Sequence, residues 1–323
     1  MPEPTLSILI ISYNTREMTL ECIRSVFDQT SETDFEVNVL DNASADGSAD
    51  AIETEFGGRV RLIRSEDNLG FAGGNNAAAK CAKGEFLLLL NPDTVVLDGA
   101  IDKLMAFAAA QPDAGIWGGR TVFADGSLNP ASCWSRQTLW SLTSQAMGLS
   151  SLFRKSSFFN PEGLGGWDRE GVRQVDIVSG CFLLIRRDLW DRLDGFHPDF
   201  FMYGEEADLC LRAETLGARP MVSSEATIIH YGGASEAVRA EKVCRLLAAK
   251  MLLVDRHFRG WRRQVAKRIL AVWPLTRAVA QRLVPHWRRG SDGRQPVEWA
   301  KVWSRRTTWM NLEFSEARKS NHV

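Results

Sequence analysis

The first half of the chain alternates short apolar runs with stretches of helical spacing, and this pattern restricts the fold more than any other feature. Strand-like runs occupy residues 6–12, 35–40, 60–63 and 85–90. Helical spacing of apolar residues occupies 15–27, 71–83 and 99–110. Strands that alternate with helices build a parallel sheet with helices on both faces. The sequence therefore predicts an α/β fold with a mostly parallel, Rossmann-like sheet.

Each of the four apolar runs ends in polar residues. In chain order these are Tyr13 and Asn14, then Asp41 with the rest of "DNASADGS", then "EDNLGFAGGNN" (66–76), then Asn91 and Asp93. Sheets of this type bind ligands in the crevice at the carboxyl ends of their strands. We therefore expect the four polar segments to line one ligand site.

Asp93 follows five apolar residues, and an ionised carboxylate in that setting needs solvent, a cation or a metal. A later strand, within 226–235, reaches His230. Together the two side chains form a partial ligand set for Mg²⁺ or Mn²⁺ that the phosphate oxygens of a ligand can complete. The alternatives are a plain turn at Asn91-Pro92-Asp93 and a structural histidine.

A predicted helix within 199–217 opens with Glu205, Glu206 and Asp208. These carboxylates either complement the helix dipole or supply a general base. Displacing a nucleoside diphosphate from a sugar needs the leaving charge stabilised and a separate carboxylate to accept the acceptor's proton. The sequence offers both groups. A glycosidase also uses two carboxylates, but it has no need of a nucleotide pocket.

Several other classes are disfavoured. The chain has no GxGxxG after its first strand, no GxxxxGK[ST] and no GxSxG, which disfavours dinucleotide, P-loop and serine-hydrolase sites. Six scattered cysteines indicate a reducing compartment. The start carries Glu3 where a signal peptide needs positive charge, and no apolar run approaches the roughly 20 residues of a spanning helix. These features predict a cytoplasmic protein.

Residues 119–174 look irregular and resemble a long excursion over one face of the sheet, and loops of that length are usually functional. Trp167 in this segment is a candidate acceptor-binding or supporting residue, as are Glu205 and Asp208. Strand character resumes at 175–187. We expect a catalytic domain over 1–240, a helical basic segment over 241–290 and a tail over 291–323.

An ordered series of motifs carries a family resemblance. The series is "SILIISYN", "LDNASADGS", "NLGFAGGNN", "LLLLNPDT", "SGCFLLIRR", "FFMYGEEADLCLR" and "IIHYGGAS". On these motifs the chain resembles inverting family 2 glycosyltransferases of the GT-A fold, most closely the rhamnosyltransferase-like members that build bacterial surface polysaccharides. The resemblance covers about residues 5–258.

The resemblance implies a role for each matched residue. Asp41 would read a pyrimidine base, with Tyr13 and Asn14 beside it. The residues that would line the nucleoside and sugar are Asn68, Gly70, Phe71 and Asn75. Asn91-Pro92-Asp93 stands at the family's DxD motif, so Asp93 would bind metal, and Asn91 in place of the first Asp implies a less charged site. Glu206 stands at the general base, usually an Asp, and His230 at a metal or diphosphate contact.

The expected activity is the inverting transfer of a deoxyhexose, L-rhamnose from dTDP-rhamnose, to a lipid-linked or polysaccharide acceptor. A UDP-sugar-dependent transferase of hexose or galactofuranose is the first alternative. A sugar nucleotidyltransferase would need a Gly-rich basic loop where this chain has "SYNTRE", and an inactive carbohydrate-binding protein would not need Asp93, Glu206 and His230. The sequence does not indicate an oligomeric state.

Residues 256–290 hold ten Lys or Arg residues and no Asp or Glu. The apolar residues among them are Trp261, Ile269, Leu270, Trp273, Leu275, Val279, Leu283 and Trp287. Helices broken at Pro274 and Pro285 would carry a cationic face and an apolar face, which is typical of an interfacial membrane helix. We therefore expect attachment to the anionic inner face of the cell membrane. A basic helix packed on the catalytic domain is the alternative, and nucleic acid is disfavoured because no module for it is present.

Overall fold

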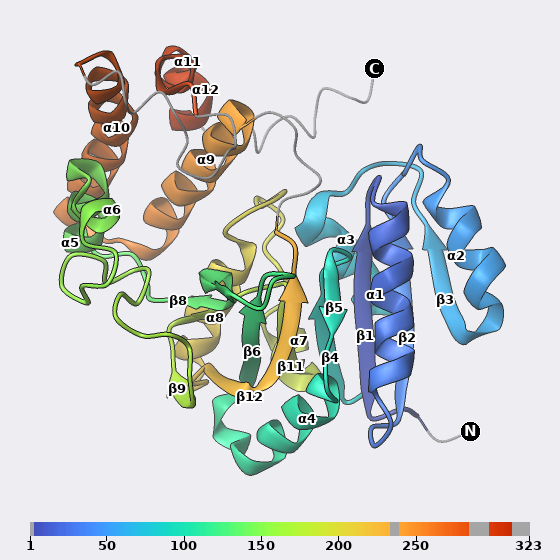
Figure 1. Ribbon diagram of the computed structural model, residues 1–323. Coiled ribbons are helices and arrows are strands. Elements are labelled where there is room, and N and C mark those ends of the chain that lie inside the picture. Colours follow the sequence, from blue (N-terminus) through green and yellow to red (C-terminus); the bar gives the residue numbers. More distant parts are fainter. Residues whose placement is uncertain (1–2, 233–238, 284–296, 312–323) are drawn as a thin grey trace. The chain divides into compact units, whose positions relative to one another are not determined.

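A computed structural model describes residues 3–232, 239–283 and 297–311 (Figure 1). The chain divides into two compact units. The first unit takes its described residues from Met1–Trp134, Trp167–Phe201 and Glu205–Ser235, and the second from Ser135–Gly166, Met202–Gly204 and Glu236–Val323. The first unit contains the sheet, and the second contains the C-terminal helices (Figure 1).

One large sheet forms the centre of the first unit. Its strands, in sheet order, are β3 (Val60–Arg64), β2 (Phe35–Asp41), β1 (Leu6–Ser12), β4 (Phe86–Leu90), β11 (Phe182–Arg186), β6 (Ile116–Val122), β12 (Met221–His230) and β5 (Thr94–Val96). Neighbours from β3 to β4 run parallel, as do β6 and β12, whereas β11 is antiparallel to both its neighbours and β5 is antiparallel to β12. The predicted α/β architecture with a mostly parallel sheet is confirmed.

Short strands extend the sheet or pair beside it. β7 (Leu128–Asn129) pairs with β6, and β9 (Val172–Gln174) pairs with the beginning of β12. β8 (Cys133–Trp134) and β10 (Ile177–Val178) form a separate pair. The strand predicted over 175–187 is therefore two strands, β10 and β11, separated by the turn at Ser179 and Gly180.

Helices connect the strands of the first unit. They are α1 (Arg16–Gln29), α2 (Ser48–Phe56), α3 (Gly70–Cys81), α4 (Ala100–Ala110), α7 (Arg187–Arg192) and α8 (Glu205–Thr215), with 3₁₀ turns η1 (Gly57–Arg59), η2 (Pro112–Ala114) and η3 (Pro130–Ser132). Every residue of β1 is buried, as expected for a central strand covered on both faces. The apolar core therefore fixes β1 and β4, whose carboxyl ends carry the polar segments predicted from the sequence.

The prediction that residues 119–174 are irregular is wrong in part. β6 extends to Val122, and α5 (Leu139–Met147) and α6 (Leu149–Leu152) follow. A capping box starts α5, because the Thr138 side chain accepts from the Ser141 backbone and the Ser141 side chain accepts from the Thr138 backbone. Both helices belong to the second unit, where Leu142 packs into the apolar cluster of the C-terminal helices.

The C-terminal helices are α9 (Arg239–His257), α10 (Gly260–Leu283), α11 (Trp299–Ser304) and α12 (Arg306–Met310). The predicted helix break at Pro274 is wrong, because α10 continues through it. Proline removes one backbone hydrogen bond, but packing next to it compensates: Thr276 Oγ1 donates to the Ala146 carbonyl and Arg277 Nη2 to the Gln145 carbonyl. Pro285 lies outside the described residues.

Apolar packing uses one side of α10. Leu270 and Ala266 are fully buried in a cluster with α5, α9 and α11, and Trp273 packs against it. Trp261, Val279 and Leu283 remain exposed on the same helix, while Trp287 lies outside the described residues. Within the described residues, the helices all fall short of the length and apolarity needed to cross a bilayer.

Candidate active site

Pairing of β5 with β12 places Asp93 beside His230. Thr94 stands opposite His230 in the register, and the Tyr231 backbone N–H donates to the Asp93 carbonyl at 3.0 Å. The Asp93 Oδ1 atom lies 3.4 Å from His230 Nε2, and both side chains are largely buried. Two residues 137 positions apart in the chain therefore form one carboxylate–imidazole pair at the ends of two neighbouring strands.

The environment of His230 favours its charged form. Burial of the ring by itself lowers the pKa of His230, but the neighbouring Cys181 sulfur and the Asp93 carboxylate outweigh burial and raise the pKa to about 10. A cation bound beside Asp93 would take the place of that proton as the positive partner of the carboxylate. The Asp93 carboxylate therefore favours one positive charge beside it, carried either by the protonated His230 ring or by a bound cation.

Asn91 completes the turn that carries Asp93. Its backbone N–H donates to the Cys181 carbonyl at 3.1 Å, and its own carbonyl accepts the Thr94 hydroxyl at 2.7 Å. Within the described residues, the buried Asn91 Oδ1 has no hydrogen-bond partner. An unpaired buried polar atom is costly, so its presence here indicates a site prepared for a ligand.

Oxygen and nitrogen donors around Asp93 fit a divalent cation in part. Among the described residues, no group of three or more His, Cys, Asp or Glu side chains forms a full metal shell. A carboxylate, an imidazole and an amide oxygen are donor types that Mn²⁺ or Mg²⁺ accepts, so Asp93, His230 and Asn91 are candidates to hold such a cation, which would need further oxygen ligands from a bound molecule.

The end of β2 presents a carboxylate with one unused oxygen. Asp41 is buried, and its Oδ2 accepts from the Ser44 backbone N–H at 3.1 Å. Within the described residues, its Oδ1 has no hydrogen-bond partner. Such an oxygen is an acceptor available to an N–H group of a ligand.

The end of β1 is tied to the same loop. Asn14 has a left-handed backbone, φ 53°, its Oδ1 accepts from the Ala45 N–H at 2.8 Å, and its N–H donates to Ser44 Oγ at 3.0 Å. Tyr13 is 40% exposed beside it and so can offer its ring to a ligand. The structure thus brings Tyr13, Asn14 and Asp41 together.

Sequence reasoning missed Asn42, which organises the third segment. Its amide donates to Asn68 Oδ1 at 3.0 Å and to the Gly70 carbonyl at 3.2 Å, and its Oδ1 accepts from the Leu69 N–H at 2.7 Å. The residue is buried directly after Asp41 within the motif "LDNASADGS", which is the signal that identifies it. Asn42 therefore holds Asn68 and Gly70 against the end of β2.

Gly70 begins α3 where only glycine fits. Its φ is +70°, and an added Cβ would lie 2.3 Å from the Phe201 carbonyl oxygen. Phe71 then donates its backbone N–H to that carbonyl at 2.9 Å. Asn75, one turn further, is buried and donates to the Phe71 carbonyl, so it fixes the first turn of α3.

Gly180 lies beside both Phe71 and Glu206. We call the edge of the sheet that carries the Asp93 turn, Gly180, Phe71 and Glu206 the rim. An added Cβ would lie 3.0 Å from the Phe71 ring and 3.9 Å from Glu206 Cβ. The next residue, Cys181, accepts from the Asn91 N–H. Gly180 therefore lies between the Asp93 turn on one side and Phe71 with the first turn of α8 on the other.

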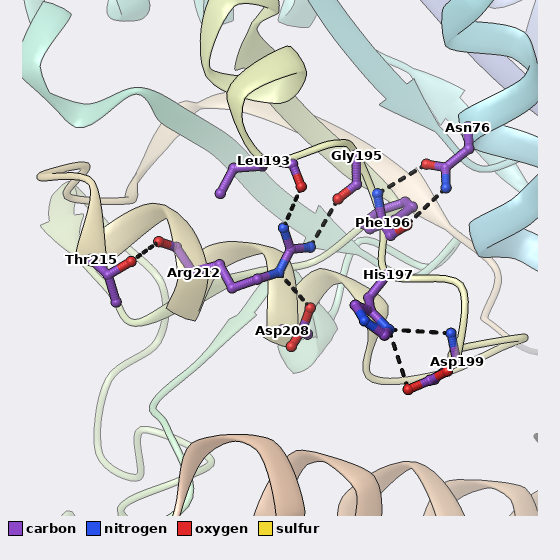
Figure 2. Close-up of polar contacts among 9 residues, drawn as sticks. All are labelled: Asn76, Leu193, Gly195, Phe196, His197, Asp199, Asp208, Arg212 and Thr215. Carbon is purple, nitrogen blue, oxygen red and sulfur yellow. Dashed lines mark hydrogen bonds and ion pairs between the residues drawn. The ribbon is translucent and has the colours of Figure 1, made fainter.

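The three carboxylates that open α8 lie in different surroundings. Glu205 is buried, Glu206 is partly exposed, and Asp208 is fully buried. Arg212 Nε donates to Asp208 Oδ2 at 2.7 Å, while its other nitrogens donate to the Leu193 and Gly195 carbonyls (Figure 2). Asp208 is therefore engaged in holding α8 to the turn at 193–196, which leaves Glu206 as the carboxylate best placed to meet a ligand.

The same turn also anchors α3. Asn76 donates to the Phe196 carbonyl at 2.8 Å and accepts from the Phe196 N–H at 2.9 Å, as Figure 2 shows. An added Cβ at Gly195 would lie 2.5 Å from Asn76 Oδ1, so the Asn76 side chain leaves no room for a side chain at position 195. The turn at 193–196 thus fixes the helix that carries Phe71 and the helix that carries Glu206.

Trp167 is not brought to this rim by the contacts that the structure shows. Its indole N–H donates to the Glu170 carbonyl, and the guanidinium groups of Arg169 and Arg173 lie 4.9 and 4.7 Å from its ring. This segment leads into β9, which pairs with the beginning of β12, whereas His230 ends that strand.

Fold and rim together define an α/β transferase. The family model of glycosyl transferase family 2 matches residues 7–193, more than half of the chain. The chain therefore belongs to glycosyl transferase family 2.

Two curated relatives illustrate the range of the family. The chain is 24% identical over 263 residues to an N-acetylglucosaminyl-diphospho-decaprenol L-rhamnosyltransferase of Mycobacterium tuberculosis, covering 75% of this chain and 82% of the relative. It is 27% identical over 234 residues to the O-antigen biosynthesis protein RfbC of Myxococcus xanthus, covering 72% of this chain but only 18% of that much longer protein.

A solved structure supports the fold. A mannosyltransferase of Pyrobaculum calidifontis, solved with GDP-Man and Mn²⁺, superposes with a TM-score of 0.55 at 16% identity, covering 100% of this chain and 88% of that one. At that identity the likeness concerns the fold, and it identifies the GT-A architecture that the sequence predicts.

Arg212 provides a test of how the site is held. Replacing Arg212 by Met should lower the free energy of unfolding by roughly 3–5 kcal/mol, because it strands the buried Asp208 carboxylate. Arg186 pairs with Asp188 on the surface, so Arg186→Met should cost only about 0–1 kcal/mol. Urea unfolding of both variants measures the difference. Equal losses would show that the Asp208–Arg212 pair does not hold α8.

Proposed function

We propose that the protein is an inverting glycosyltransferase that moves a sugar, L-rhamnose from dTDP-rhamnose, to a lipid-linked or polysaccharide acceptor in cell-surface glycan synthesis. The observation that carries the proposal is the rim from the Asp93–His230 pair through Gly180 to Glu206. One end holds the charge-stabilising groups for a diphosphate, and the other holds a partly exposed carboxylate. Both parts are needed to displace a nucleoside diphosphate.

The nucleotide base would bind at the ends of β1 and β2. The free Oδ1 of Asp41 is a buried acceptor, which matches the ring N–H of thymine or uracil. Tyr13, exposed beside it, would pack on the base. The loop that Asn42 holds would lie along the nucleoside and sugar through Asn68, Gly70 and Phe71.

Asp93 and His230 would hold a divalent cation, and the side-chain oxygen of Asn91, which belongs to the same turn as Asp93, is a further candidate ligand. When bound, Mg²⁺ or Mn²⁺ supplies Lewis-acid stabilisation to the departing diphosphate. In its absence, the protonated His230 ring already places positive charge at this position. The protein groups therefore favour negative charge developing on a leaving group here.

Glu206 would accept the proton of the acceptor hydroxyl as that oxygen attacks the anomeric carbon. The new C–O bond forms as the bond from the anomeric carbon to the diphosphate oxygen breaks, and attack from the opposite side inverts the configuration. Glu206 is the partly exposed carboxylate at the start of α8, whereas Asp208 is neutralised by Arg212.

Relatives support the acceptor class and the donor. The mycobacterial relative is named as an L-rhamnosyltransferase that acts on N-acetylglucosaminyl-diphospho-decaprenol, and the Myxococcus relative is named for O-antigen biosynthesis. The first name supports rhamnose and a lipid-linked acceptor, and the second supports glycan synthesis. A UDP-sugar-dependent transferase is the second candidate, because uracil offers Asp41 the same N–H donor as thymine.

Asp93 carries the prediction for donor binding. Asp93→Ala should abolish metal-dependent binding of the nucleotide sugar and leave the fold intact, because the carboxylate is the anionic member of the pair. Thermal shift with dTDP-rhamnose, UDP-sugars and Mn²⁺ measures binding, and Asp113→Ala, an exposed carboxylate of η2, is the control. Unchanged metal dependence in Asp93→Ala would contradict the assignment, and stabilisation by a UDP-sugar instead of dTDP-rhamnose would support the second candidate.

Glu206 carries the prediction for catalysis. Glu206→Gln should lower kcat roughly 10²- to 10⁴-fold while donor affinity is kept, since the amide cannot take the proton. Glu214→Gln, an exposed position on the same helix, should leave turnover unchanged. Release of nucleoside diphosphate in the presence of acceptor is the measurement. Near-normal turnover in Glu206→Gln would move the base to Glu205 or Asp208.

We also propose that the basic segment attaches the protein to an anionic membrane surface. Residues 256–283, the described part of the segment, hold eight Lys or Arg residues and no acid. Helix α10 exposes Arg262, Arg263 and Arg268 together with Trp261. Its other side belongs to the apolar cluster of the second unit, so the helix is both packed and cationic.

Arginine substitutions test the attachment better than truncation, because removing α10 would also remove buried residues such as Leu270. Changing Arg262, Arg263 and Arg268 to Gln should weaken binding to anionic vesicles, at roughly 1 kcal/mol for each charge lost. The control changes three exposed arginines of the first unit, Arg61, Arg192 and Arg219, to Gln. Vesicle flotation at low and high salt is the measurement, and equal binding by the two variants would exclude α10 as the anchor.

A further inference from the structure

An exposed aromatic cluster lies outside everything assigned so far. Its rings are those of Trp140 on α5, Phe153 directly after α6, and Phe158 and Phe159 in the loop that follows, and we call these residues, with the exposed Leu152 that precedes Phe153 in the chain, the aromatic patch. Leu152 is 74% exposed and Phe158 is 62% exposed. Contiguous apolar surface of this kind is uncommon on proteins without a partner and marks an interaction site.

The rings of the aromatic patch contact one another instead of a core. Trp140 and Phe158 have centroids 4.8 Å apart, Phe153 and Phe159 likewise 4.8 Å, and Phe158 and Phe159 5.0 Å. Phe153 is 44% exposed and Trp140 39% exposed despite these contacts. The side chains therefore form one surface whose outer face is not covered by any described residue.

Backbone hydrogen bonds hold this surface in place. The Ser156 N–H donates to the Phe153 carbonyl, the Asn160 N–H to the Ser156 carbonyl, and the Gly165 N–H to the Asn160 carbonyl. The Trp140 indole N–H donates to the Phe158 carbonyl at 2.6 Å, so the one polar atom of that side chain is satisfied. The loop is thus built to present aromatic side chains, and the presentation requires no rearrangement.

Positive charge surrounds the aromatic patch. Arg154 and Lys155 are exposed within it, and residues 139–161 contain no Asp or Glu. Glu162, the first acid beyond, is engaged by Lys250 and by Gln145. The adjoining α10 is basic, and it contacts α5 through Thr276 and Arg277. The occupant of this surface must therefore combine an apolar layer with negative charge.

We propose that the aromatic patch inserts into the headgroup and upper acyl region of an anionic lipid bilayer. Aromatic and leucine side chains flanked by Lys and Arg suit that boundary, where the rings enter the apolar layer and the cations remain at the phosphates. The inference rests on the membrane attachment proposed above. It adds a short-range apolar contact, from a segment 100 residues before α10 in the chain, to the charge attraction of the helix.

The test uses the full chain and vesicles of phosphatidylcholine with phosphatidylglycerol. Leu152→Ser with Phe158→Ser should lower vesicle partitioning at least about tenfold, since both exposed side chains lose their apolar transfer free energy. The matched control, Val172→Ser with Leu216→Ser, changes two exposed apolar residues of the first unit and should leave binding unchanged. Hydrogen exchange should show protection of residues 148–160 on vesicles. Phe158→Ser also removes ring contacts with Trp140 and Phe159, so the melting temperature of each variant is measured and partitioning is compared well below the lowest one.

Three other outcomes of the vesicle experiment would each contradict the insertion of the aromatic patch into lipid. If the Leu152/Phe158 variant binds vesicles as the parent does, the attachment stands and the aromatic patch is not part of it. If the parent itself does not bind vesicles, the attachment fails with it, while sugar transfer to a soluble acceptor remains a separate measurement. If the variant changes only the oligomeric state in light scattering, a second copy of the chain covers the patch and no lipid is involved.

Discussion

The pairing of a three-residue strand with the end of β12 is the constraint on which the site depends. β5 pairs antiparallel with β12, and Thr94 at its start lies opposite His230. The turn after β4 therefore places the Asp93 side chain next to the His230 ring. Burying either the Asp93 carboxylate or a protonated His230 ring without a partner would cost free energy. Together they form a neutralised pair that tolerates low exposure, and the buried Asn91 Oδ1 in the same turn has no hydrogen-bond partner among the residues that the structure describes.

A second constraint keeps the opposite side of the rim in place. The turn at 193–196 accepts hydrogen bonds from Arg212 of α8 and exchanges a pair with Asn76 of α3. Buried polar groups of this kind are stabilising only when every partner is present. The side chains of Asn76 and Arg212 therefore help to position the helices that carry Phe71 and Glu206, and a change at Arg212 would reach Glu206 through α8.

The sequence predicted the strands 6–12, 35–40, 60–63 and 85–90 to within about a residue, because short segments rich in apolar and β-branched residues between turn residues are typical of strands. It missed β6, in which Gly118 and Gly119 weaken strand propensity. The structure shows why glycine is needed, since a Cβ at Gly119 would lie 2.1 Å from the Ala226 carbonyl. Polar strand ends made Asp41 and Asp93 candidates, and these roles stay predictions, whereas Asn42, Asn76 and Arg212 act through contacts that periodicity cannot reveal. Trp167 was chosen by residue type alone, and its contacts lie elsewhere.

Two kinds of force would act in the second unit over different distances. Attraction between the arginines of α10 and anionic lipid extends over roughly 10 Å at moderate salt, so it governs approach and weakens as salt rises. Apolar contact by Leu152 and Phe158 requires that water be excluded, so it acts only after arrival and is insensitive to salt. Membrane binding through both features would be reversible and would also fix the orientation of the second unit. Charge attraction alone permits many orientations, whereas insertion of an ordered aromatic loop permits few. If the acceptor is anchored in lipid, as proposed, attachment would have to hold the second unit at a defined orientation to the membrane surface.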